Sequence, residues 1–146
     1  MGVAAHEKGY SVLITDDDEP FRETLREILE PAGFRTYLAG SGEEALNLAH
    51  SVDLHLVLLD QNLPRLSGLE TLRMLRKMEL LIPVILMTAN RTEQLLREAM
   101  TADAFCVMIK PFDRRSLLAT VDDALRHGRR PRQKRQRRPP PRWELT

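Results

Sequence analysis

Acidic, hydroxyl and amine side chains follow four separate apolar segments of this chain, each at the point where the segment ends. The residues in these places are Asp16, Asp17, Asp60, Thr88 and Lys110. Clustered carboxylates repel one another and raise the pKa of at least one member, and a divalent cation relieves that repulsion. Mg²⁺ suits a site of a few carboxylates completed by water. If the five side chains meet, they form an acidic Mg²⁺ pocket in which a carboxylate can act as nucleophile and carry a phosphoryl group.

Each of these residues alone also has an ordinary structural explanation. The acids of residues 16–19 could form a solvated turn that caps a helix, and Asp60 could simply end a strand. Thr88 is β-branched and fits a strand without any chemistry, and Lys110 could be a loop lysine before a proline. A buried cluster of salt bridges is the structural alternative for the whole set. The combination is more specific than its members, because acids, hydroxyl and amine end different segments.

The segments that would position these groups alternate between short apolar runs and amphipathic stretches. Strands are expected over 11–15, 34–39, 55–60, 83–88 and 104–109, with a helix after each. Strict alternation predicts a parallel sheet with helices on both faces, and functional groups in such sheets lie at the carboxyl ends of the strands. The residues expected at helix starts are Pro20 in a first turn, Ser41 with Glu44 and Ser67 with Glu70 as capping boxes, Asn90 with Glu93, and Asp113.

Length and composition indicate one domain with an aliphatic core. The chain has 146 residues, of which 42% are hydrophobic and only 5% aromatic, and this length suits a single domain. The single cysteine, Cys106, excludes an internal disulfide and fits a reducing compartment. Residues 1–10 lack the apolar stretch of a signal peptide, and no apolar run is long enough to span a membrane. We therefore expect a cytoplasmic protein that is not associated with membranes.

Charge divides the chain into an acidic body and a basic tail. Residues 1–125 hold 13 Lys and Arg against 20 Asp and Glu, whereas residues 126–146 hold 9 against 1. We expect an N-terminal extension over 1–9, the folded domain over 10–127 and, over 128–146, a disordered tail or linker stub rich in Pro and Arg. The tail could contact nucleic acid phosphates non-specifically, or it could be a solvated segment. Nucleic acid is expected as a partner only through this tail.

Four segments resemble the signature blocks of response-regulator receiver domains, in the order and spacing of that family. They read VLITDDDEP over 12–20, LDQNLPRLSG over 59–68, MTA over 87–89 and KPF over 110–112. The resemblance implies a flavodoxin-like, doubly wound sheet of five parallel strands in the order 2-1-3-4-5, with helices on both faces. It also implies a signalling receiver similar to the single-domain chemotaxis regulators. Such a protein is not a conventional enzyme, because it catalyses only its own phosphorylation and dephosphorylation.

The same resemblance implies roles for the acids. Asp60 matches the aspartate that is phosphorylated and that also binds Mg²⁺. Asp17 matches the direct Mg²⁺ ligand, Asp16 the acid that acts through a water molecule, and Asn62 the residue whose backbone carbonyl is a further ligand.

The phosphoryl-binding residues and the partners are implied in the same way. Thr88 matches the switch hydroxyl, Lys110 matches the lysine that pairs with phosphoryl oxygen, and Ala89 is small enough to leave room for a phosphodonor. The donor would be a sensor histidine kinase or a phosphotransfer protein of a two-component phosphorelay. The resulting conformational change would control a downstream output protein, with a phosphorylation-dependent dimer as a further possibility.

Two positions depart from the family pattern. Val107 stands three residues before the lysine, where the family usually has Tyr or Phe, and Asp103 stands where it often has Gly. Phe105 is aromatic but two residues early, and we expect it to face the same side of the strand as Val107. These departures leave the expected catalytic set intact and put the relay of the signal to an output surface in doubt.

Two other classes of protein compete with this interpretation. A phosphatase of the haloacid-dehalogenase type also uses an Asp-x-Asp motif after an apolar strand, as Asp16 and Asp18 would provide. However, Pro20 stands where that family usually has Thr or Val, and the chain is short for its cap. A dinucleotide-binding module is weaker, because acids at the first turn would repel a pyrophosphate and Gly40-Ser41-Gly42 lacks the third glycine.

Overall fold

Five short strands form the central sheet of the computed structural model, which describes residues 9–128. They are β1 (Ser11–Thr15), β2 (Arg35–Ala39), β3 (Leu56–Asp60), β4 (Val84–Thr88) and β5 (Cys106–Ile109). All neighbouring strands pair in parallel, in the order β2-β1-β3-β4-β5. The expected topology is confirmed, and the more polar β2 is an edge strand as predicted.

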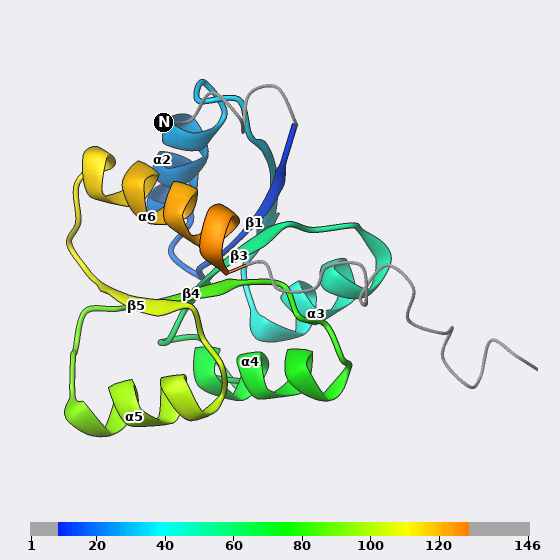
Figure 1. The fold of residues 1–146 in the computed structure, drawn as a ribbon, viewed down its shortest axis with the longest axis vertical. Coiled ribbons are helices and arrows are strands. Elements are labelled where there is room, and N and C mark those ends of the chain that lie inside the picture. The colour runs from blue at the N-terminus through cyan, green and yellow to red at the C-terminus, as the bar shows by residue number, and fades with distance from the viewer. Residues whose placement is uncertain (1–8, 129–146) are drawn as a thin grey trace, which may run out of the picture.

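Helices cover both faces of this sheet (Figure 1). One face carries α2 (Glu19–Leu29) and α6 (Arg114–His127), and the other carries α3 (Gly42–Ser51), α4 (Gly68–Lys77) and α5 (Glu93–Thr101). Side chains alternate along β3, so that Leu56 and Leu58 enter one apolar layer while Val57 and Leu59 enter the other. Because β3 is buried on both faces, its sequence is apolar without interruption until Asp60.

Most of the expected helix starts are confirmed. Pro20 lies in the first turn of α2, Asp113 caps α6, and Ser67 with Glu70 forms a complete capping box on α4. Ser41 caps α3, because its side chain accepts a hydrogen bond from the backbone nitrogen of Glu44.

Two capping predictions are wrong in detail. The Glu44 carboxylate accepts from the backbone nitrogen of Gly40 at 2.6 Å, so the box on α3 is not closed on Ser41 itself. Thr92 rather than Asn90 caps α5, since its hydroxyl accepts from the backbone nitrogen of Leu95 at 3.0 Å. Asn90 lies two residues earlier, in the loop after β4, where its backbone nitrogen donates to the Thr88 hydroxyl.

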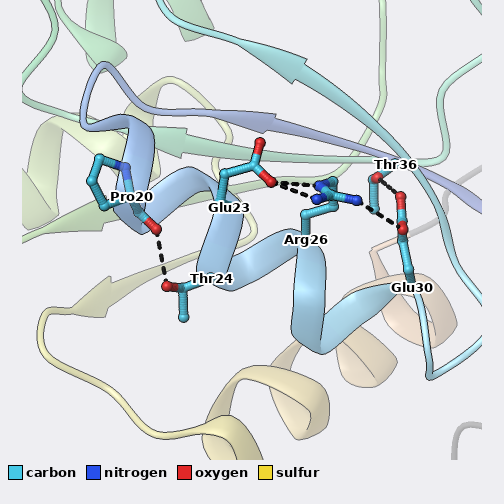
Figure 2. A network of polar contacts seen from close by, with 6 residues as sticks. All are labelled: Pro20, Glu23, Thr24, Arg26, Glu30 and Thr36. Atoms are coloured by element: carbon cyan, nitrogen blue, oxygen red, sulfur yellow. Dashed lines mark hydrogen bonds and ion pairs between the residues drawn. The ribbon is translucent and has the colours of Figure 1, made fainter.

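A polar network fixes helix α2 to the edge strand β2 (Figure 2). Arg26 pairs with Glu23 at 2.6 Å and with Glu30 at 3.2 Å, and the second Glu30 oxygen accepts from the Thr36 hydroxyl at 2.6 Å. Exposed pairs of this kind contribute little free energy one by one. Together with the buried Leu25 and Leu29 they attach α2 to the sheet, and its first turn follows the carboxyl end of β1.

The region around β5 explains one departure and corrects one expectation. Asp103 has a backbone φ of +67°, a left-handed conformation that Asp adopts more readily than most non-glycine residues. Phe105 does not face the same side as Val107: its ring packs with the layer under α2 and α6, and Val107 packs with the opposite layer. Phe105 precedes the first residue of β5, so the alternation of the strand does not yet apply to it.

The predicted extension and tail lie outside the described residues, apart from Gly9 and Gly128. Within 9–128, none of the helices is long and apolar enough to cross a membrane.

Candidate metal centre at the carboxyl edge of the sheet

A polar pocket of about 560 Å³ lies at the carboxyl edge of the sheet. Its lining includes every residue that the sequence pattern selected, namely Asp16, Asp17, Asp60, Asn62, Thr88, Ala89 and Lys110. The parallel register brings the ends of β1, β3, β4 and β5 to the same edge. Val107, the departed position, is half-buried in β5 and is not part of the lining.

Three carboxylates form the acidic part of the pocket. One oxygen from each of Asp16, Asp17 and Asp60 can be chosen such that all three lie within 4.8 Å of one another. Asp16 and Asp60 are 1% and 4% exposed, whereas Asp17 is open to solvent. The site offers clustered carboxylate oxygens, one of them on an acid that faces solvent. Such a site fits a small divalent cation that retains part of its water shell. No other such group of acids, histidines or cysteines occurs within residues 9–128.

The turn after β1 holds Asp16 through four separate contacts. Its backbone nitrogen donates to the Ala39 carbonyl at 3.1 Å, and its backbone carbonyl accepts from the Arg22 guanidinium at 2.7 Å. Its two carboxylate oxygens accept from the backbone nitrogen of Asp18 at 2.9 Å and from Lys110 at 2.8 Å. Asp17 lies between Asp16 and the capping residue Asp18, lines the pocket and is open to solvent.

Lys110 bridges the two buried acids. Its Nζ atom lies 2.8 Å from Asp16 Oδ2 and 3.0 Å from Asp60 Oδ1. Burial lowers the pKa of Lys110, but the hydrogen bonds and charges of Asp16 and Asp60 outweigh burial, and the net pKa is raised. Lys110 is therefore a fixed positive charge at neutral pH.

The pKa of Asp60 is raised despite this partner. Burial is the largest cause, and the negative charge of Asp16 adds to it. Lys110 and the backbone nitrogen of Asn62 lower the pKa of Asp60 without cancelling the rise. The protein alone therefore provides too little positive charge to stabilise the ionised Asp60 carboxylate fully, and an added cation would supply it.

The loop after β3 depends on a glycine that the sequence analysis did not single out. The backbone nitrogen of Gly68 donates to the Gln61 carbonyl at 3.0 Å, and the Gln61 side chain accepts from Leu69 at 2.8 Å. A Cβ at Gly68 would collide with the backbone carbonyl of Asp60. This close approach holds the loop that carries Asn62. In the sequence, Gly68 appears only as the last residue of the block over 59–68, next to the helix cap Ser67.

The Thr88 hydroxyl is engaged in its own loop. It accepts from the backbone nitrogen of Asn90 at 3.0 Å and lies 3.4 Å from the Asn90 carbonyl oxygen. Ala89, which is exposed, stands between them at the pocket rim. Exchanging one local hydrogen bond would free the hydroxyl for a ligand in the pocket.

Comparisons with known proteins agree with this geometry. The family model for the response regulator receiver domain matches residues 12–122. The uncharacterized transcriptional regulatory protein YkoG of Bacillus subtilis is 40% identical over 122 residues, covering 84% of this chain and 53% of YkoG. The regulatory protein AtoC of Escherichia coli is 37% identical over 114 residues, covering 78% of this chain and 25% of AtoC. The chain thus spans between a quarter and about half of these curated relatives.

Solved structures give the same result. A CheY-like receiver domain protein from Methanospirillum hungatei superposes with a TM-score of 0.78 at 26% identity, covering 82% of this chain and 95% of that one. None of the matches described supports the alternative of a haloacid-dehalogenase-type phosphatase.

Proposed function

The chain belongs to the response-regulator receiver family of two-component signalling, and from this we propose that Asp60 accepts a phosphoryl group in a Mg²⁺-dependent reaction. The observation that carries the proposal is the grouping of Asp16, Asp17 and Asp60 within 4.8 Å, with Lys110 bridging two of them. Structural salt-bridge clusters balance their charges, whereas this one keeps an excess of negative charge around an open pocket.

The metal would be held by oxygen atoms from two strand ends and one loop. Asp17, Asp60 and the backbone carbonyl of Asn62 would be direct ligands, and Asp16 would act through a water molecule. Bound Mg²⁺ would supply positive charge to the transferring phosphoryl group.

The chemical step is a displacement at phosphorus. An Asp60 carboxylate oxygen forms the new P–O bond while the bond from phosphorus to the donor breaks. With acetyl phosphate as donor, the electron pair of the broken bond leaves on acetate, so the reaction needs no oxidant or added proton. Lys110, already in an ion pair with Asp60 at 3.0 Å, would pair with a phosphoryl oxygen.

Release of the Thr88 hydroxyl from the Asn90 loop would follow. The hydroxyl would donate to a phosphoryl oxygen, and exposed Ala89 leaves room for donor and water. The chemistry is therefore limited to formation and hydrolysis of the aspartyl phosphate on the protein itself.

The partners follow from the family and remain part of the proposal. A sensor histidine kinase or phosphotransfer protein would supply the phosphoryl group in the cytoplasm, and a downstream protein or a phosphorylation-dependent dimer would carry the output. The printed names of AtoC and YkoG describe regulatory proteins. Nucleic acid contact by this chain would involve the basic residues of 129–142.

Intact mass spectrometry after incubation with acetyl phosphate and Mg²⁺ tests the proposal. We expect one added phosphoryl group that hydroxylamine removes and that chelation of Mg²⁺ prevents. Asp53, an exposed aspartate outside the pocket lining, provides the matched control: Asp53→Asn should label normally and Asp60→Asn should not. Normal labelling of Asp60→Asn would refute the assignment.

A further inference from the structure

We propose that Phe21 is a positioning residue for Lys110, whose ammonium group its ring holds where a phosphoryl oxygen on Asp60 would need it. The inference rests on the function proposed above and adds a residue to its machinery. In the sequence, Phe21 is an apolar residue directly after Pro20, in the first turn of α2.

The ring of Phe21 faces the ammonium group directly. Lys110 Nζ lies 4.3 Å from the ring centre, within the range of a cation–π interaction. The same nitrogen lies 2.8 Å from Asp16 and 3.0 Å from Asp60. An ammonium group has three hydrogens, so two carboxylates and one aromatic face form its immediate surroundings. Both Lys110 and Phe21 are half-buried, so the contact is only partly screened by solvent.

Phe21 is itself held in place by both segments that build the site. It lies in the first turn of α2, where its backbone nitrogen donates to the capping carboxylate of Asp18 at 3.4 Å. Phe112 packs edge-on against it, with ring centres 5.9 Å apart and an interplanar angle of 71°. Because Phe112 follows Lys110 by two residues, the aromatic pair connects the β1–α2 turn to the end of β5.

A neutral ring suits this position better than a charged partner would. When a phosphoryl group is present, Lys110 has to exchange its contact with the Asp60 carboxylate for one with a phosphoryl oxygen. A third carboxylate would compete with the phosphoryl group for the ammonium. The ring attracts the cation through its quadrupole and carries no net charge, so it can hold Lys110 throughout the exchange.

Site-specific fluorination of Phe21 separates electrostatic attraction from packing. Fluorine atoms withdraw charge from the ring face while leaving its shape nearly unchanged. We expect the rate of phosphorylation by acetyl phosphate at saturating Mg²⁺ to fall stepwise with each added fluorine. Phe21→Leu should lower it about fivefold, equivalent to about 1 kcal/mol, and Phe21→Tyr should retain it. Fluorination of Phe34, which is buried in the same apolar layer, is the matched control and should leave the rate unchanged.

The NMR shift of the Lys110 side-chain methylene next to nitrogen provides a second readout that does not need phosphorylation. Ring current should move this signal upfield in the wild type and in Phe21→Tyr, and the displacement should vanish in Phe21→Leu. A normal rate in the fluorinated and leucine proteins, or no ring-current displacement in the wild type, would overturn the role of Phe21. Absence of any phosphorylation of the wild type would instead refute the proposed function, and the NMR signature would remain.

Discussion

Replacing Asp17 by Asn should make the metal-free protein more stable and at the same time abolish most of its stabilisation by Mg²⁺. Asp17 shares the pocket with the carboxylates of Asp16 and Asp60 and with the single ammonium of Lys110. Its carboxylate therefore experiences an excess of one negative charge. The asparagine removes that repulsion and also removes a direct metal ligand.

The magnitude follows from the separation of the charges. Two like charges 4.8 Å apart repel by roughly 3.5 kcal/mol at an effective dielectric constant of about 20. Asp17 is open to solvent, which screens the interaction, so we expect the metal-free variant to gain about 1 kcal/mol. Mg²⁺ at a concentration of about 100 times its dissociation constant should stabilise the wild type by about 2.7 kcal/mol. At the same concentration the variant should gain less than about 1 kcal/mol, because its affinity is weaker.

Urea unfolding in EDTA and in Mg²⁺ measures the free energy of unfolding of the wild type and of Asp17→Asn in both conditions. Asp53→Asn, which lies outside the pocket lining, is the matched control, and Mg²⁺ should stabilise it as much as it stabilises the wild type. Equal stabilisation of Asp17→Asn and wild type by Mg²⁺ would refute the assignment of Asp17 as a ligand. A loss of stability in EDTA would refute the repulsion argument.

Three further predictions concern pH, the loop after β3 and β5. The raised pKa of Asp60 means that the folded protein binds a proton more tightly than the unfolded chain, so metal-free stability should fall as pH rises from the ordinary aspartate pKa through the raised one. Urea unfolding of Asp60→Asn should show the loss of this pH dependence, and an unchanged pH profile in the variant would contradict the prediction. Gly68→Ala should lower the free energy of unfolding by more than about 2 kcal/mol and slow phosphorylation, because its Cβ would collide with the Asp60 carbonyl. If thermal unfolding showed the variant to be as stable as the wild type, the loop would be yielding freely and the prediction would be wrong. Val107 has a small, stiff side chain that cannot turn inward as a ring would, so beryllofluoride should shift amide NMR signals around Thr88 strongly and those of β5 and α6 weakly. Equal shifts in all three regions would contradict this prediction.

The positions of the strand ends could be predicted because buried parallel strands are uninterrupted apolar runs. Asp60 and Thr88 end such runs, and the parallel register alone is enough to bring them to one edge. The sequence could not show that Lys110 reaches back to Asp16, since that contact joins residues 94 positions apart. It also gave no sign that the Phe21 ring meets this lysine, because a helical apolar stripe looks the same whether it packs on leucines or on an ammonium.

The errors have local causes. Asn90 and Thr92 are both capping residues by type, and only the backbone conformation decides that Thr92 caps α5. Phe105 was assigned to a face by counting along a strand expected from residue 104, whereas β5 begins at Cys106. Gly68 ends the block over 59–68 but was given no role, because its importance comes from the Asp60 carbonyl beside it in space.

Peptide mapping of the phosphorylated protein tests the central claim most directly. Wild-type protein treated with acetyl phosphate and Mg²⁺ would be trapped by borohydride reduction, which converts an aspartyl phosphate to homoserine, then digested and sequenced by mass spectrometry. We predict homoserine at Asp60 alone, and none when EDTA replaces Mg²⁺. Modification at another acid in place of Asp60, or no modification of the metal-loaded protein, would contradict the account.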